Sequence, residues 1–444
     1  MTPLLRAFYI TAVLGLLIWG LTDVRRRAET DPARPGAHRT DFTVYTEAGA
    51  AFFDGRNPYA VTNPRGWHYL YPPLFALLVT PLHPLPTQWQ GVAWFILSLL
   101  MAGGCLYECR AILRALQQAG ATVQDAWREG RLWIILGAFA AILIPFLDTL
   151  QRGQVGVAIL WPLLLGFRLV IEKQDGLRSF LGGLILALPV VIKATPALPV
   201  CILLVRLLSD AAQGRQWAWH RFTRASAGVM AGLLLFFLLV PAAVIGWTDN
   251  LTHLETWYRT VASNKQVGPD QDFNVTSYRN QSLANAVLLL GQWLDYRMDE
   301  GLAAPAVTAV RACLVLLLLL VAARGRPGPE PLGLAAVFGL ACAVTLPLSP
   351  ISWGHHFIIL LPALLLVPLA VQAKGHHLAA KILASSAAVL LLVHYVSFEV
   401  ARGIIGSLGL LGIAMAGWCL AAAVLLVWDR APRAPAVTPV PVAS

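Results

Sequence analysis

Apolar runs of membrane-spanning length recur along almost the whole chain and constrain its fold more than any other feature. They lie at residues 5–22, 88–107, 132–149, 154–172, 179–192, 195–209, 226–247, 303–323, 331–348, 356–373, 378–397 and 407–428. A helix needs about 20 mainly apolar residues to cross the hydrocarbon core of a bilayer. Only 13% of the residues are charged, against about 25% in a soluble domain, so lipid has to cover this apolar surface. The sequence therefore predicts an all-α polytopic membrane protein with about twelve transmembrane helices.

The arginines and lysines between these runs predict the orientation of the spans. Most of those in short loops fall on one side of the membrane, which the positive-inside rule makes the cytoplasmic side. This arrangement places the N-terminus inside and two long loops, about 23–87 and 248–302, on the outer face. The run 5–22 is expected to be a retained span, because no small-residue cleavage site follows it. The net charge of +10 is spread among the loops, so it does not predict nucleic-acid binding.

We expect one membrane domain over residues 1–430 and a disordered Pro-rich tail over residues 431–444. The stretch TDFTVYTEAGAAFFDGRNPY, residues 40–59, predicts a short amphipathic helix that starts at Thr40 or Asp41 and ends at Gly55. Asp41 either caps this helix or acts as a catalytic base, and local spacing does not decide between the two. A further apolar piece, residues 73–80, is too short to span and predicts a half-helix on the outer side.

Two more features of the expected outer face carry chemistry. His68, Tyr69 and Tyr71, in the segment WHYLYPP, either belong to an interfacial aromatic belt or line a substrate cleft. Lys193 stands between two short apolar runs in VVIKATP. An ionisable residue in such a place is costly and marks a functional site by default, although a lysine can also extend to the interface along its aliphatic stem.

Polar residues also gather at the turns between spans. Asp148 and Arg152 have the spacing of an ion pair on a helix, and Gln154 follows them in a tight turn. In the second long loop, Arg279, Asn280 and Gln281 form a polar patch.

Two adjacent histidines, His355 and His356, follow Trp353 at the start of a late span. Their position fits anion binding, a plain interfacial location, or a metal site. The metal site is the weakest of the three alternatives, because neighbouring rings do not converge easily on one ion and no acidic residue is near in sequence.

Together these features place one carboxylate, several cations and many aromatic side chains on one membrane face. Sugar transfer from a lipid-linked phosphosugar needs such a set: donors for the leaving phosphate, a base for the acceptor hydroxyl, and a lipid-exposed groove for the polyprenyl tail. The alternatives are a transporter or flippase for a lipid or polyol, and a non-catalytic partner in cell-envelope synthesis. Transporters usually show internal repeats and ionisable residues near the midplane, and we find neither pattern in this sequence.

The order of the short motifs resembles glycosyltransferase family 87. These motifs are DFTVY, GRNPY, YLYPPLFAL, RGQV, IKATP, NQSL and SPISWGHH, between about residue 40 and residue 370. The resemblance implies the GT-C fold and short juxtamembrane helices in the outer loops. It also implies a polyprenyl-phosphate sugar, with mannose as the expected hexose, as donor, and a lipid or glycan hydroxyl as acceptor. The expected location is the bacterial inner membrane, with membrane lipids around the protein and the active site on the extracytoplasmic side.

The same resemblance assigns roles to individual residues. Asp41 would be the general base of an inverting displacement, and Lys193, His355 and His356 would bind the donor phosphate with help from Arg152 or Arg279. Related metal-using enzymes carry two acidic residues spaced by one in the first outer loop, but Asp41-Phe42-Thr43 lacks the second, so no metal and no cofactor are expected. The residues expected to line the substrate cleft are Tyr45, Tyr59, His68, Tyr69, Tyr71, Gln154, Asn280, Gln281 and Trp353.

Overall fold

The computed structural model describes residues 3–29, 38–64, 66–118, 120–172, 176–262, 280–293, 300–324, 331–400 and 410–428. Apart from one isolated bridge between Thr62 and His68, these residues form helices and connections and no strand. The helices are α1 (Pro3–Ala28), α2 (Thr43–Phe53), α3 (Pro73–Val79), η1 (Thr80–Leu82), α4 (Thr87–Gln117), α5 (Ala121–Arg152), α6 (Gly156–Ile171), α7 (Gly176–Ile192), α8 (Ala197–Ala212), α9 (Gln216–Leu233), η2 (Leu234–Leu239), α10 (Val240–Ile245), α11 (Trp247–Trp257), η3 (Tyr258–Ala262), α12 (Leu283–Trp293), α13 (Glu300–Arg324), α14 (Leu332–Leu348), η4 (Gly354–Leu360), α15 (Leu361–Ala373), α16 (His377–Val400) and α17 (Leu410–Val427).

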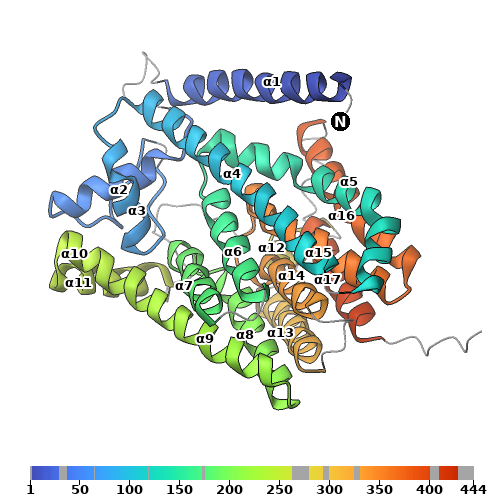
Figure 1. Ribbon diagram of the computed structural model, residues 1–444. Helices are drawn as coiled ribbons and strands as arrows, with labels where there is room; N and C mark the ends of the chain where they lie inside the picture. Colours follow the sequence, from blue (N-terminus) through green and yellow to red (C-terminus); the bar gives the residue numbers. More distant parts are fainter. Residues whose placement is uncertain are drawn as a thin grey trace, which may run out of the picture.

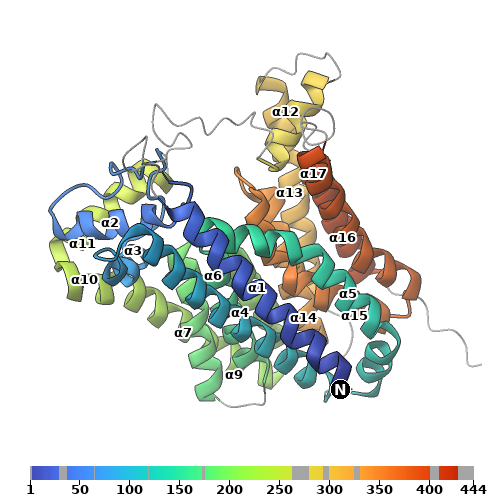
Figure 2. The ribbon, with the colours of Figure 1, turned by 90° about the horizontal axis from the view of Figure 1, so that it is seen from above.

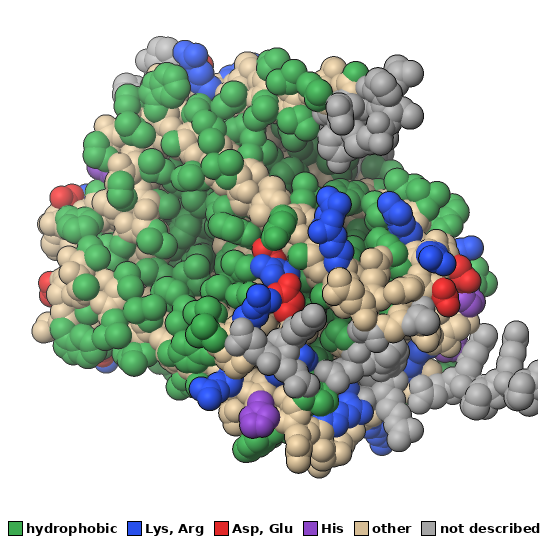
Figure 3. Space-filling model, viewed as in Figure 1, with side chains coloured by type: hydrophobic (Ala, Val, Ile, Leu, Met, Phe, Trp, Pro, Cys, Tyr) green, Lys and Arg blue, Asp and Glu red, His purple; other side chains and the backbone are tan. Residues whose placement is uncertain are grey.

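The described helices have the lengths and composition of a membrane bundle. Six of them are long and apolar enough to cross a membrane, and five shorter apolar helices accompany them. Large apolar side chains face outward from several helices, as Leu100 on α4, Met230 on α9 and Leu316 on α13 do. Green hydrophobic side chains accordingly cover most of the left side of the surface in Figure 3. The prediction of an all-α polytopic membrane protein is confirmed, whereas the number of about twelve spans is not.

Helices α14 and α15 form the centre of the bundle. Almost every residue of α14 is buried, and 89% of the α15 span with its preceding turn lies inside the protein. The rings of Phe167 on α6 and Phe338 on α14 stack with centroids 4.1 Å apart. Because this centre is surrounded by other helices, the outer helices rather than α14 and α15 meet lipid.

A compact group of short helices lies at one end of the bundle. Helices α2, α3, α10 and α11 lie together in both views of the ribbon (Figure 1, Figure 2). An aromatic core joins α2 and α3 to α4: the rings of Phe42 and Trp94 stack at 5.0 Å, and Phe75 packs edge-on against Trp94 at 5.6 Å. The predicted amphipathic helix and half-helix are therefore present as α2 and α3, and together with α4 they fix the segment that contains Asp41.

Candidate active site

A cavity of about 430 Å³ lies where segments far apart in the sequence meet beside α2. Its walls come from the start of α2, the segment before α3, the α5–α6 turn, the α7–α8 connection, the end of α11 and the segment before α15. Nine of the residues expected at the site from the sequence line this one cavity: Asp41, Tyr45, His68, Tyr71, Gln154, Lys193, Trp353, His355 and His356. The structure therefore collects most of the sequence candidates in a single place.

Asp41 lies directly before α2. Of the two expected caps, Thr40 bonds the start of the helix: its Oγ1 accepts the Phe42 N–H at 3.3 Å, while Phe42 itself makes no side-chain cap bond. The Asp41 backbone N–H donates to the carbonyl of Arg152 at 3.0 Å. Its side chain lines the cavity, where Oδ2 accepts a hydrogen bond from Gln154 Nε2 at 3.0 Å. The α5–α6 turn thus holds the carboxylate at the cavity.

Gln154 connects Asp41 to Tyr45. The Tyr45 hydroxyl donates to Gln154 Oε1 at 3.2 Å, which leaves the amide N–H of Gln154 to donate to Asp41. Burial raises the pKa of Tyr45 well above its ordinary value, so the phenol keeps its proton. Gly153 makes this geometry available, since its φ of +71° suits glycine and an added Cβ would lie 2.7 Å from the Cβ of Phe42.

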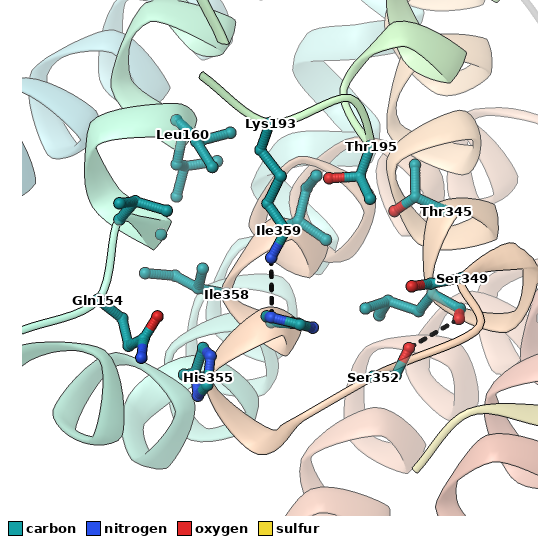
Figure 4. Close-up of a pocket in the computed structure, with 15 residues that line it drawn as sticks. Gln154, Leu160, Lys193, Thr195, Thr345, Ser349, Ser352, His355, Ile358 and Ile359 are labelled. Atoms are coloured by element: carbon teal, nitrogen blue, oxygen red, sulfur yellow. Dashed lines mark hydrogen bonds between the residues drawn. The ribbon is translucent and has the colours of Figure 1, made fainter. Parts of the chain in front are cut away.

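Lys193, which contacts His356, is the cationic group of the cavity. Lys193 Nζ lies 2.8 Å from His356 Nε2, as the dashed line in Figure 4 shows, and 5.9 Å from the ring centroid of Tyr71. Burial lowers the pKa of Lys193 from 10.5 to about 8, because a low-dielectric surrounding disfavours the charged amine. A smaller recess of about 40 Å³ shares Lys193, His355 and His356 with the cavity. An anion bound there would stabilise the charged form of Lys193.

The second histidine is tied to an ion pair behind the cavity. His355 Nδ1 lies 3.5 Å from Asp148 Oδ2, and Arg152 Nε donates to the other oxygen, Asp148 Oδ1, at 2.6 Å. The predicted pairing of Asp148 with Arg152 is confirmed. Arg152 itself does not line the cavity, because its guanidinium faces Asp148. Asp148, which was not among the sequence candidates, therefore orients both His355 and Arg152.

The two histidine rings do not aim at one point. Their planes meet at 84° with centroids 4.6 Å apart, and each ring has its own neighbour, Lys193 for His356 and Asp148 for His355. Within the described ranges, no three side chains of His, Cys, Asp or Glu come together in a geometry that could hold a metal ion. The pair has the geometry of two separate polar contacts with a ligand.

Two of the candidate tyrosines support the cavity wall instead of lining it. Tyr69 is fully buried; its hydroxyl donates to the Pro72 carbonyl at 2.6 Å and accepts from the Ala76 N–H at 3.1 Å. The hydroxyl of Tyr59 donates to the Tyr71 carbonyl at 3.2 Å. Both phenols bind backbone groups of the segment that presents Tyr71, so their expected place in the substrate cleft is not observed.

Asn280 and Gln281 do not line the cavity but bond to a segment that does. Asn280 Oδ1 accepts the Ser352 N–H at 3.0 Å, and the Gln281 N–H donates to the Ser352 carbonyl at 2.7 Å. These buried residues hold the segment before His355 in place. Arg279, expected to assist the phosphate, lies outside the described residues.

Sequence reasoning missed several cavity residues. Trp257, at the end of α11, lines the cavity, and its indole N–H donates to the Leu70 carbonyl at 3.2 Å. Thr195 and Ser349 add hydroxyl groups to the same lining. The sequence signal for Trp257 was an aromatic residue in the long loop 248–302, but nothing local connected that residue to Leu70.

The model of glycosyltransferase family 87 matches residues 69–350, more than half of the chain. The chain belongs to glycosyltransferase family 87. The matched residues include Tyr71, Gln154 and Lys193, whereas Asp41 and the histidine pair lie outside them. The predicted class, a membrane glycosyltransferase, is confirmed by the family and by the apolar helices.

Curated relatives of this family 87 protein are mannosyltransferases. One relative is the polyprenol-phosphate-mannose-dependent alpha-(1-2)-phosphatidylinositol mannoside mannosyltransferase of Mycolicibacterium smegmatis. Its sequence is 28% identical to this chain over 346 residues, which cover 74% of this chain and 69% of the relative. Identity to the Mycobacterium tuberculosis protein of the same name is 26% over 355 residues, 75% of this chain and 70% of the relative. A Mycolicibacterium smegmatis protein named for phosphatidylinositol pentamannoside is 26% identical over 340 residues, 74% of this chain and 69% of the relative. No solved structure matches the chain significantly.

Proposed function

We propose that this family 87 protein transfers a mannosyl residue from polyprenyl-phosphate-mannose to a hydroxyl group of a lipid or glycan acceptor. The named relatives support the donor and the sugar. The observation that carries the chemistry is the meeting of Asp41 with Lys193, His355 and His356 in one cavity. A base and a phosphate-binding group are the two functions that this transfer requires of a protein.

Asp41 is the proposed general base. The acceptor hydroxyl gives its proton to the Asp41 carboxylate while its oxygen forms a bond to the anomeric carbon. The bond between that carbon and the phosphate oxygen breaks, and its electron pair leaves with the polyprenyl phosphate. Attack opposite the leaving group inverts the anomeric configuration. Gln154 holds the carboxylate at the cavity by a hydrogen bond of 3.0 Å from its Nε2 to Oδ2.

Lys193 and the histidine pair are the proposed phosphate site. The phosphodiester of the donor gains one negative charge when it becomes the leaving phosphate, so hydrogen-bond donors fixed at this point favour the transition state over the ground state. Lys193 and His356 meet at 2.8 Å in the recess that both share with His355. Tyr71 and Trp353, which line the main cavity, offer ring surfaces to the sugar.

The polyprenyl chain has an apolar wall to follow. Val44, Leu70, Trp257 and Val261 line the cavity on the side of α2, α11 and η3. Each isoprenoid carbon that leaves water for such a wall contributes about 0.8 kcal/mol per buried CH₂. This lining favours a lipid-linked donor over a water-soluble sugar nucleotide.

The direct test is transfer by the purified protein in lipid vesicles. With polyprenyl-phosphate-mannose and a phosphatidylinositol mannoside acceptor, we expect a mannosylated product whose new anomeric configuration is opposite to that of the donor. Polyprenyl-phosphate-glucose and GDP-mannose are the matched controls and should give little product. Retained configuration, or a preference for GDP-mannose, would refute the proposal.

The site is further proposed to work without a metal ion and on the extracytoplasmic side of the inner membrane. Activity should survive a chelator, because the charge on the phosphate is met by Lys193. For sidedness, Asp54→Cys near α2 should react with a membrane-impermeant maleimide in intact cells, and Arg114→Cys at the far end of α4 should not. Loss of activity with chelator, or the opposite labelling pattern, would contradict these two points.

A further inference from the structure

Arginines gather around a second cavity at the other end of the bundle. It measures about 770 Å³ and lies between the last turns of α4 and the first half of α5, where Arg110, Arg114, Arg128 and Arg131 line it. Figure 3 shows Lys and Arg side chains concentrated on the right and lower parts of this face, away from the mostly hydrophobic left part. Neither the family nor the cavity beside Asp41 accounts for this group of arginines.

The arginines near this point fall into two electrostatic groups. In an adjoining cavity, which Arg110 and Arg114 also line, Arg168 pairs with Glu108 and, at 2.8 Å, with Glu172, and Arg178 reaches Glu172 at 3.1 Å. Those guanidinium charges are largely neutralised by the carboxylates.

The four arginines of the larger cavity have no such partners among the residues that the structure describes. None of them makes an ion pair with a carboxylate in the described ranges of the chain, and all four are exposed. Glu129, next to Arg128 in sequence, pairs instead with His377 at 3.1 Å. Four uncompensated guanidinium groups around one cavity are a site for an anion, because arginine matches phosphate oxygens with paired N–H groups.

The level of the cavity in the membrane points to a lipid as the source of that anion. Trp94 on α4 stacks against Phe42, the residue next to Asp41, at the end of the bundle that carries the candidate active site. Arg110 and Arg114 lie later on the same helix. At about 1.5 Å per residue this separation is about 24–30 Å, close to the thickness of the hydrocarbon core, about 30 Å. The arginine cavity therefore lies at the membrane interface opposite the candidate active site.

Apart from Gln117 and Gln124, the rest of the lining is apolar. Leu106 and Phe139 are 50% and 45% exposed, and Leu113, Ile135 and Leu365 continue the wall. A free phosphate would make no favourable contact with these apolar surfaces. The acyl chains of a lipid would cover them once its headgroup is bound. The combination of a cationic rim with apolar walls matches a phospholipid.

We propose that this cavity binds the headgroup of an anionic phospholipid, distinct from the donor and acceptor of the transfer reaction. The phosphate lies among Arg110, Arg114, Arg128 and Arg131, and the acyl chains run along Leu106 and Phe139. Basic groups at the cytoplasmic surface recognise anionic lipids in this way. The inference does not depend on the proposed mannosyl transfer.

The test uses native mass spectrometry of the purified full chain in detergent, titrated with 1-palmitoyl-2-oleoyl phosphatidylglycerol. The Arg110→Gln/Arg114→Gln variant should bind this lipid about 25-fold more weakly, since each arginine near an anionic headgroup contributes about fivefold. Arg224→Gln/Arg324→Gln, which removes the same charge from exposed positions outside the cavity, should bind like the wild type. A circular dichroism melt of each variant checks that it is folded.

A second variant and two further ligands make the outcome decisive. Arg128→Gln/Arg131→Gln, on the opposite wall, should show the same loss as the α4 variant. The corresponding phosphatidylcholine should bind weakly, and glycerol phosphate should not displace the anionic lipid. Equal losses in the control variant, equal binding of phosphatidylcholine, or displacement by glycerol phosphate would each overturn the proposal.

Discussion

The pKa of Lys193 predicts a pH profile that separates its role from a structural one. Burial lowers this pKa from 10.5 to about 8, so the free enzyme loses the lysine charge as the pH rises through 8. One unit above the pKa, about one-tenth of the protonated form remains. If the charged amine binds the donor phosphate, kcat/KM for the donor should therefore fall about tenfold between its plateau and pH 9.

The same reasoning predicts a difference between kcat/KM and kcat. The bound phosphate favours the charged amine and raises the pKa of Lys193 in the complex, and kcat reports the complex while kcat/KM reports the free enzyme. The inflection in kcat should accordingly lie at higher pH than the inflection in kcat/KM. Tyr71, whose pKa burial raises to about 12, keeps its proton throughout this range.

The alkaline fall would not reflect unfolding through Lys193. Between about pH 8 and 10.5 the unfolded chain binds a proton at this lysine that the folded chain lacks, so this group makes folding more favourable as the pH rises. Stability and activity are thus expected to change in opposite directions over this interval. A melting curve at each pH, recorded beside the rates, separates the two.

Substitutions of Lys193 set the expected size of the effect on kcat/KM and the result that would refute its role. Lys193→Ala removes a charge-assisted hydrogen bond of about 1.5–3 kcal/mol, which is about 10- to 150-fold in kcat/KM for the donor. Lys193→Arg keeps its charge and should lose the inflection near pH 8, while Lys374→Ala, whose amine binds the Leu426 carbonyl, should keep the wild-type profile. A Lys193→Arg profile with the same inflection near pH 8 would refute the assignment.

Three further outcomes follow from the contacts around the cavity. Gln154→Leu removes the hydrogen bond to Asp41 and should lower kcat about 10- to 100-fold, with donor affinity nearly unchanged in a binding assay; an equal loss of donor affinity would argue against a positioning role. Gly153→Ala places a methyl group at positive φ and 2.7 Å from the Cβ of Phe42, so the free energy of unfolding should fall by about 1–2 kcal/mol or more; an unchanged melting temperature in detergent would contradict that geometry. Tyr69→Phe deletes a buried hydroxyl with two backbone partners and should cost about 1–3 kcal/mol of stability, visible in the same melt, whereas Tyr107→Phe at an exposed position should not.

The helices could be predicted because their signal is local. Apolar runs of sufficient length, and the helical spacing of Phe42, Tyr45, Ala48 and Phe52, depend only on neighbours in sequence. The predicted segments therefore recur as helices of the structure, including α2 and α3. The number of spans was harder to predict, because buried helices such as α14 are as apolar as those that face lipid.

The site could be predicted only in part, because side-chain direction depends on distant contacts. Asp41 sits where local rules favour a helix cap, yet its carboxylate is held by Gln154, which is far away in sequence. Tyr69 and Tyr71 belong to the same short segment, but Tyr69 packs into the wall and Tyr71 faces the cavity. Trp257 joins the lining through Leu70, a contact that no pattern in either segment indicates.

The central claim is that Asp41 acts as the base in a cavity that binds the donor through other residues. The most direct measurement compares Asp41→Asn with Asp54→Asn, an exposed carboxylate of the same stretch that pairs with Arg56. In lipid vesicles, Asp41→Asn should bind polyprenyl-phosphate-mannose as tightly as the wild type and transfer mannose about 10²- to 10⁴-fold more slowly. Asp54→Asn should behave as the wild type in both assays. Transfer by Asp41→Asn at the wild-type rate would contradict the account.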